Sequence, residues 1–267
     1  MRITPDPQSH NAGGAVDLSE ILGYLDGLLS PDEFEDYGPN GLQIPGATRV
    51  SAVLTGVSGQ LELFERAREL GAELVVVHHG ILWDFQPLRV SAQQAARLKT
   101  LLCAGISLAA YHLPLDAHPA IGNNALLADR LGATSHTPFG MHRGRPIGVA
   151  AHFDGDGLAA GELFDRVRAV TAREPLVLGA GPERVRSIGI VSGAGADSLP
   201  EAIAQGLDGL LTGEPREHVM ADAREAGVHF IAAGHYATET LGVRGLGELV
   251  AERFSIRHEF IDIPNPV

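Results

Sequence analysis

The chain of 267 residues has a single cysteine, and this shortage excludes several classes of protein. One thiol cannot form an internal disulfide, and it cannot supply a zinc or iron–sulfur site made of several cysteines. Cys103 lies in the apolar run LKTLLCAGISLAAYH, so we expect it to be a buried structural thiol. A chain without a disulfide framework fits a reducing compartment, and we therefore expect a cytoplasmic protein.

Positive charge, aromatic residues and long apolar runs are also scarce. The 20 basic residues are outnumbered by 33 acidic ones, which gives a formal net charge of −13. This sign opposes the binding of duplex nucleic acid by broad neutralisation of phosphates. Aromatic residues make up only 5% of the chain and leave few platforms for stacking single-stranded bases. No apolar run is long enough to cross a bilayer, so we expect no membrane partner.

The order of the apolar patterns predicts an α/β protein with a largely parallel sheet. Residues 1–16 mix proline, glycine and polar residues, so we predict a mobile N-terminal arm, with folded structure starting at Asp17. After it, short apolar runs alternate with helical patterns. The predicted strands are VSAVLTG, ELVVVHH and ISLAAYH, and the predicted helices cover about 61–70, 92–104 and 124–131.

The same order of patterns returns in the second half of the chain. Residues 51–80 can be aligned with residues 186–214, and the later AAYH, ending at His112, corresponds to AAGH, ending at His235. We interpret this as a duplication of one α/β unit. Convergent strand–helix–strand patterning remains the alternative, because short matches arise by chance.

The duplication implies a first unit over residues 17–135 and a second over residues 146–267. The stretch SHTPFGMHRGRP, rich in histidine, glycine and proline, would form the boundary between them. The closing helix, at about 238–254, and the last strand, EFIDI, can pack on either half.

Histidines and carboxylates follow three of the predicted strands, which is where open parallel sheets collect their chemistry. Each has an ordinary interpretation by itself, as a hydrogen-bonded strand-end histidine or a loop carboxylate. If His78 and His79 serve one site, the chain must already turn at His79–Gly80, and Pro114 predicts a loop after the next strand. Together these side chains favour a site for two divalent metals, because such ions take imidazole and carboxylate ligands. The residues are His78, His79, His112, Asp116, His235 and Glu239.

Six strings, in order, carry a resemblance to a known family. They are DYGPNGLQIPG, LVVVHHGILW, YHLPLDAHPAIGNNALLADRLG, LLTGE, AAGHYATE and FIDIPNP. With them the chain resembles, from about Asp17 to Pro266, the hexameric dinuclear-metal-centre proteins known as GTP cyclohydrolase I type 2 homologues, or Nif3-like proteins. The resemblance implies two intertwined α/β repeats, a toroidal homohexamer and two divalent ions per subunit, with zinc, iron and manganese all open.

The resemblance also implies roles for particular residues. The metal ligands would be His78, His79, Asp116, His235 and Glu239, with Glu239 bridging the two ions. His112 and Glu214 match family positions close to the site, and we take them as candidates for proton transfer, His112 first. If His112 has no catalytic role, it would instead orient Asp116. His142 and His218 match no family motif, and we expect ordinary surface residues.

Two classes of function stay open. The first is a metal-dependent hydrolase acting on a small anionic, phosphate-bearing or nucleotide substrate, including the opening of the guanine ring of GTP. The familiar GTP cyclohydrolase holds its zinc with two thiolates and an imidazole, which a single cysteine cannot supply. The second class is a non-catalytic ring that binds single-stranded nucleic acid or a protein partner. The turn VSGAGADS, at 191–198, offers amides that could cradle a phosphate, but the signal is weak and we favour a plain strand-to-helix turn.

Overall fold

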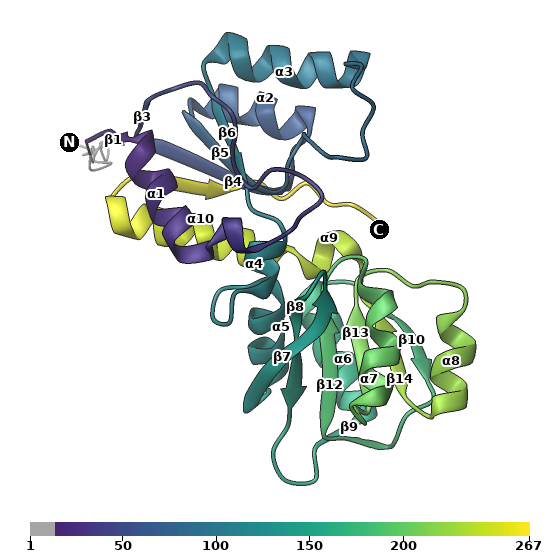
Figure 1. Cartoon of the computed structure of the whole chain (residues 1–267). Coiled ribbons are helices and arrows are strands. Elements are labelled where there is room, and N and C mark those ends of the chain that lie inside the picture. The colour runs from purple at the N-terminus through teal and green to yellow at the C-terminus, as the bar shows by residue number, and fades with distance from the viewer. Residues whose placement is uncertain (1–13) are drawn as a thin grey trace, which may run out of the picture.

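The computed structural model describes residues 14–267, which form two α/β units stacked end to end (Figure 1). The predicted arm over 1–16 lies mostly outside the described residues. Its last residue belongs to the fold, because β1 (Val16–Asp17) pairs with β3 (Arg49–Val50). No helix in the described part of the chain is long and apolar enough to span a membrane.

The first unit is a five-stranded sheet with helices on both faces. Its strand order is β15-β4-β5-β6-β2, and only the edge strand β2 is antiparallel to its neighbour. The strands are β2 (Gly41–Ile44), β4 (Ala52–Ser58), β5 (Leu74–His79), β6 (Ser107–Ala110) and β15 (Arg257–Phe260). The helices are α1 (Leu18–Leu29), α2 (Leu61–Leu70), α3 (Ala92–Ala104) and α10 (Thr240–Phe254), with a short 3-10 turn η1 (Pro31–Glu33).

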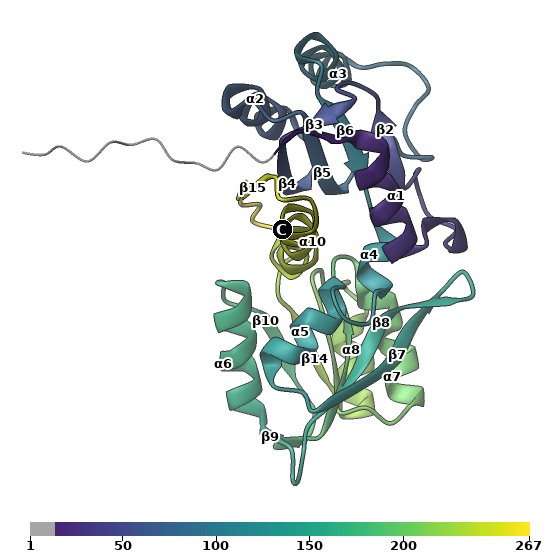
Figure 2. The same cartoon turned by 90° about the vertical axis from the view of Figure 1, so that its left-hand side faces the viewer.

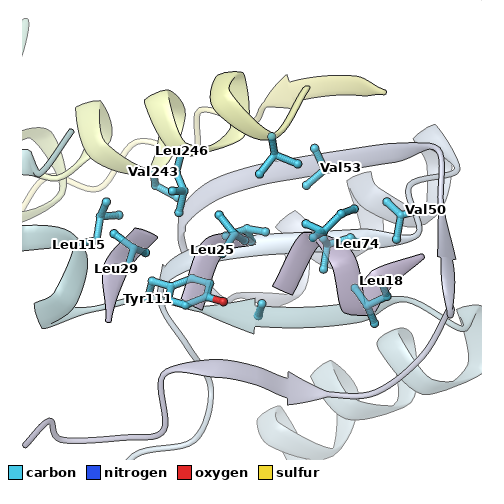
Figure 3. Packing of buried hydrophobic residues seen from close by; sticks show 14 of the residues in the cluster. Leu18, Leu25, Leu29, Val50, Val53, Leu74, Tyr111, Leu115, Val243 and Leu246 are labelled. Carbon is cyan, nitrogen blue, oxygen red and sulfur yellow. The ribbon is translucent and has the colours of Figure 1, made fainter. Parts of the chain in front are cut away.

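Alternation along the central strands divides the first core between two helical layers. Val53 and Leu74 face α1 and α10, where they pack with Leu246 (Figure 3). The next residues along the same strands, Leu54 and Val75, face α2 and α3. Because successive side chains of a strand point to opposite faces, the continuous apolar runs of β4 and β5 supply both layers.

The second unit is a six-stranded mixed sheet with the order β10-β14-β13-β12-β8-β7. Its strands are β7 (Ser135–His142), β8 (Arg145–His152), β10 (Leu176–Gly179), β12 (Ser187–Val191), β13 (Gly209–Thr212) and β14 (His229–Ala232). A two-stranded sheet, β9 (Leu158–Ala159) with β11 (Arg184–Val185), lies at its far end. The helices are α5 (Asn123–Leu131) and α6 (Ala160–Thr171) on one face, with η2 (Gly195–Ser198), α7 (Leu199–Ala204) and α8 (Val219–Ala226) on the other.

The two sheets contain equivalent sets of strands in the same arrangement. In the first unit β4, β5 and β6 are parallel neighbours followed by the antiparallel edge strand β2, and in the second β12, β13 and β14 are followed by the antiparallel edge strand β10. The segment in which the sequence suggested a boundary forms the hairpin of β7 and β8. Helix α5, although it precedes that hairpin, packs into the second core through Leu127 and Leu131.

The chain crosses between the units twice. It leaves the first through α4 (Leu113–Ala117) and returns from the second through α9 (His235–Thr238), which is labelled in Figure 1, into α10 and β15 (Figure 2). The closing helix and strand therefore pack on the first half. As a consequence, the carboxyl ends of β5 and β6 lie opposite those of β13 and β14.

Two local predictions were wrong. Pro114 lies within the first two positions of helix α4, where its missing N–H costs no helical hydrogen bond, so the segment is a short helix and not a loop. Cys103 is exposed, because α3 buries Leu101 and turns the following residues outward. The strand β6, later in the same run, is buried throughout.

Candidate metal centre

Four imidazoles converge where the two units meet. His78 and His79 end β5, His112 follows β6, and His235 begins α9 after β14. Ring centroids are 4.7 Å apart for His78 and His79, 5.1 Å for His79 and His235, and 5.5 Å for His79 and His112. The strand continues through His79, whose carbonyl accepts from the Gly59 amide at 2.7 Å, so the turn expected at His79–Gly80 begins only after His79.

Three of these imidazoles have their Nδ1 atoms held by oxygen acceptors, and the Nδ1 of His79 lies 3.3 Å from a hydroxyl. A carbonyl or carboxylate partner only accepts, so Nδ1 carries a proton there, and in the neutral imidazole the lone pair is on Nε2. Such partners are typical of metal-binding histidines. The contacts are His78 to the Tyr111 carbonyl at 3.0 Å, His112 to Asp36 at 2.7 Å, His235 to Glu214 at 2.5 Å, and His79 to the Ser58 Oγ.

Glu239 lies between the imidazoles of the two units. Its Oε1 is 3.5 Å from the Nε2 of His78, and its Oε2 is 3.2 Å from that of His79 and 3.3 Å from that of His235. Asp116 presents Oδ2 to the Nε2 of His78 at 3.5 Å. The two oxygens of Glu239 therefore face two different sets of nitrogen atoms.

Asp116 is not oriented by His112. Its Oδ1 accepts hydrogen bonds from Asn123 Nδ2 at 2.8 Å and from Ser192 Oγ at 3.0 Å, which leaves Oδ2 for the cluster. The sequence-based alternative in which His112 orients Asp116 was therefore wrong. His112 is held instead by Asp36, 76 residues away in the sequence.

The unsatisfied atoms of the cluster fit a divalent metal. His78 Nε2 and Glu239 Oε2 are buried without a hydrogen-bond partner among the described residues. Burial without a partner is costly for polar atoms of this kind, and coordination of a cation removes the cost. Three groups of side chains bring potential ligand atoms within 4.8 Å of one another: His78 with His79 and His112; His79 with His235 and Glu239; and His78 with Asp116 and Glu239.

Burial and nearby charges raise the pKa values of some residues of the cluster and lower those of others. Burial disfavours the imidazolium forms of His78 and His235, but nearby carboxylates outweigh it and raise the pKa of each to about 9. Burial and the other imidazoles lower the pKa of His79 to about 3, despite the opposing charge of Glu239. Burial opposes the ionisation of Glu239, yet the surrounding imidazoles hold its pKa well below the usual range. The cluster thus keeps a bare carboxylate beside a neutral imidazole.

Asp36 forms a charged support for His112. Its side chain is 2% exposed and accepts hydrogen bonds from the His112 ring, the Asn40 amide group and the backbone amides of Tyr37 and Leu113. Burial raises the pKa of this carboxyl, but the bond and the charge of His112 outweigh burial and bring it to about 2. Asp36 therefore stays ionised and keeps the proton of His112 on Nδ1.

Gly193 gives Glu239 the room it needs. It has φ +61°, and a Cβ atom at this position would lie 2.2 Å from Glu239 Oε1 and 3.0 Å from His235 Nε2. Its amide donates to Thr238 Oγ1 at 3.0 Å, and the Gly195 amide donates to Thr212 Oγ1 at 2.9 Å. The favoured interpretation of this segment as a plain strand-to-helix turn agrees with these bonds, because both amides are already satisfied within the protein and are not free to cradle a phosphate.

A cleft of about 690 Å³ opens above the cluster. Its walls come from both units, and the hairpin of β7 and β8 contributes His142. The expectation that His142 is an ordinary surface residue was wrong, because it lines this cleft, 5.3 Å from the Tyr37 ring between centroids. His218 is exposed, as expected.

The sequence did not identify the residues that position the side chains of the cluster. Asp36, Asn123 and Gly193 all lie in strings that the sequence had singled out: DYGPNG, GNNALL and VSGAGADS. No spacing rule connects these strings to their partners, because each contact depends on how the units dock.

The fold and the cluster define a mixed α/β protein with a histidine–carboxylate site, suited to divalent metal, between its two units. The chain belongs to the Duf34/NIF3 (NGG1p interacting factor 3) family, whose model matches residues 16–266.

Curated relatives cover nearly the whole chain. Proteins named GTP cyclohydrolase 1 type 2 homolog are similar to it at 38% identity in Deinococcus radiodurans, over 98% of this chain and 99% of the relative. The match in Pseudomonas aeruginosa has 41% identity over 94% of this chain and 99% of the relative.

Solved structures agree with this assignment. A structure described as protein ybgI, of unknown function, superposes with a TM-score of 0.88 at 38% identity, covering 94% of this chain and all of that one. The protein TTHA1606 from Thermus thermophilus superposes with a TM-score of 0.84 at 34% identity, and the match covers 94% of this chain and all of that one.

Proposed function

We propose that this protein is a dinuclear metal-dependent hydrolase that acts on a small phosphate-bearing or nucleotide substrate and works as a homohexamer. The observation that carries the proposal is the pair of unsatisfied buried atoms, His78 Nε2 and Glu239 Oε2, in a cluster of which His79, His235 and Glu239 line an open cleft. The name of the curated relatives, GTP cyclohydrolase 1 type 2 homolog, agrees with hydrolysis of a nucleotide.

The cluster offers two sets of ligands that share Glu239. One ion would be held by His78 Nε2, Asp116 Oδ2 and Glu239 Oε1, and the other by the Nε2 atoms of His79 and His235 with Glu239 Oε2. Imidazole and carboxylate ligands suit zinc, iron and manganese. When bound, a pair of such ions activates a water molecule near neutral pH and stabilises negative charge that develops on the substrate.

His112 is suited to move a proton in this site. Asp36 keeps its Nδ1 protonated, so Nε2 is the atom that accepts or returns a proton on the side of the cluster. Glu214 holds Nδ1 of His235 and is itself partly exposed to the cleft, which makes it the second candidate for proton transfer.

The test is turnover by the metal-loaded protein on a panel of phosphomonoesters, phosphodiesters and nucleoside triphosphates. We expect hydrolysis of at least one class, abolished by a chelator and restored by added metal. The His112→Ala variant should keep both metals and lose about 100-fold in turnover, the usual contribution of a positioned proton-transfer group. Loss of metal without a further loss of rate per bound metal would contradict this role. A panel with no metal-dependent hydrolysis would contradict the proposed function.

A further inference from the structure

The mouth of the cleft gathers aromatic side chains in a chain that has few of them. Tyr37, Trp83 and Phe85 line it, and we call these three residues the aromatic rim. The rings of Trp83 and Phe85 are stacked, with centroids 5.6 Å apart and an interplanar angle of 18°. Phe85 is nevertheless 70% exposed. An aromatic surface left open inside a cleft is stabilised when a flat ligand covers it.

The aromatic rim lies directly beside the metal cluster. The Trp83 ring centroid is 5.3 Å from that of His112 and 6.1 Å from that of His79. The Tyr37 ring lies 6.3 Å from His112 on the same measure. A ring that stacks on the rim is therefore close to whatever is bound at the cluster, so a ligand can occupy both places if its charged group lies near its ring.

The arginines of this region are paired with carboxylates. The Arg143 guanidinium lies 4.9 Å from the centre of the Tyr37 ring and 3.2 Å from Glu35. Arg216, which lines the cleft, lies 3.1 Å from Asp197. The cleft thus combines ring surface with ligand atoms for metal within about 690 Å³, a volume typical of sites for small molecules, and the charge that attracts an anion would come from ions bound at the cluster.

We propose that the cleft binds a flat aromatic or heteroaromatic ring that carries an anionic group, either on the ring or joined to it by a spacer no longer than a ribose. The ring stacks on the aromatic rim, and the anion lies at the metal cluster. This inference rests on the proposed function and narrows its substrate class to ring-bearing anions. Sugar phosphates and other ring-free phosphates are then poor ligands.

The single tryptophan of the chain makes this contact directly observable. Trp83 fluorescence, excited where nucleotides absorb little, should be quenched when guanosine 5′-monophosphate is added to the metal-loaded protein. Ribose 5-phosphate, which has the same sugar and phosphate without the base, should leave the signal unchanged. Equal responses to the two compounds would overturn the proposal.

Variants of Trp83 distinguish the loss of stacking from a general loss of structure. By calorimetry, Trp83→Leu should lower the affinity for guanosine 5′-monophosphate about 10-fold or more, the range expected for a stacked base, whereas Trp83→Phe should retain most of it. Neither should change the affinity for ribose 5-phosphate or the metal content. A Trp83→Leu variant that binds the nucleotide as tightly as the original protein would overturn the inference.

The outcomes also separate this inference from the proposed function. If guanosine 5′-monophosphate and phenyl phosphate bind no better than ribose 5-phosphate, but all bind only with metal present, the aromatic subsite is wrong and the metal site stands. If no phosphate binds in a metal-dependent way, the proposed function itself is contradicted, and the inference falls with it. Much tighter binding of a thymidine 12-mer than of the mononucleotide would make the rim part of a single-strand surface and overturn the small-molecule assignment.

Discussion

Glu239 lies beside histidines from both units of the molecule. Its carboxylate is 2% exposed and faces His78 from the first unit with one oxygen, and His79 and His235 with the other. A carboxylate this deeply buried is stable as an anion only because positive charge or metal surrounds it. The placement of the Glu239 carboxylate therefore depends on the space around it as much as on its charge.

The space around Glu239 can be tested with Gly193→Ala. The added Cβ would lie 2.2 Å from Glu239 Oε1, so the carboxylate has to move and metal affinity should fall about 10-fold or more. Gly206→Ala is the matched control, because it also has positive φ, +69°, but its Cβ would meet no atom within 4 Å. We expect both variants to lose about 1 kcal/mol of stability to backbone strain, and only the first to lose metal. Full metal content in Gly193→Ala would show that Glu239 is not placed as described.

The raised pKa values of His78 and His235 predict how metal binding depends on pH. Near pH 7.5 both imidazoles are protonated in the metal-free protein, since their pKa values lie at about 9. Metal binding should then release about two protons per chain, and apparent affinity should rise with pH up to about 9. Calorimetry in buffers of different ionisation enthalpy measures the release. Binding without proton release at pH 7.5 would contradict the prediction.

The same shifts have a consequence for the stability of the metal-free protein. A group whose pKa is raised on folding stabilises the folded state fully below its unfolded pKa, here 6.5, and loses that contribution as pH rises through about 9. The lowered pKa of His79, about 3, opposes folding only where the unfolded imidazole is protonated, at pH values below about 6.5, so it contributes little to the comparison of pH 7 with pH 9. The metal-free protein should therefore unfold more easily at pH 9 than at pH 7.

Among the secondary-structure elements, helix α10 contacts both units of the molecule. It packs on β4 of the first sheet through Val243 and Leu246, and its first turn contacts the second unit, where the Gly242 amide donates to Asn123 at 2.8 Å. Because Glu239 immediately precedes it, α10 also fixes the start of the cluster. One helix thus connects the core of the first unit to the histidine–carboxylate cluster.

Leu246→Ala tests this connection. Leu246 is fully buried, so the variant should lose about 2–5 kcal/mol in the free energy of unfolding, measured with denaturant on the metal-free protein. Leu102→Ala on α3, where the side chain is 57% exposed, is the matched control and should lose less than about 1 kcal/mol. Equal effects from the two substitutions would contradict the placement of α10 in the core.

The elements that could be predicted from the sequence are those with strong local signals. Helices α2 and α3 occupy the predicted ranges, because each has an apolar stripe and ends at a glycine with positive φ, Gly71 and Gly105. The short helix α4 could not be recognised, since proline at a first helical turn resembles proline in a loop. The supports of the cluster were beyond prediction for another reason: Asp36 and His112 meet only once the fold is complete.

At the scale of the whole molecule, the cluster sits where two sheets present their carboxyl ends to each other. Parallel sheets usually collect ligands at that edge, and two such edges facing one another enclose a site from both sides. The net charge of −13 would not oppose an anionic ligand here if the cluster holds divalent ions as proposed, because those ions would be local positive charges.

The proposed assembly is also tested at this scale. A homohexamer of this 28.1 kDa chain has a mass of about 169 kDa, which light scattering measures directly. We expect this mass with metal bound and at moderate salt. A species at the mass of one chain under these conditions would refute the hexamer, while leaving the ligand set within each chain unaffected.

If Glu239 joins two metal positions in one chain, as we propose, the amount of metal bound to each chain will show it. Elemental analysis of the purified protein should find two first-row divalent ions per chain, and Glu239→Gln should lose occupancy at both positions because it removes the shared charge. Glu252→Gln, at an exposed position on the same helix α10, is the matched control and should keep both ions. Two ions per chain in Glu239→Gln, as in the control, would contradict the account.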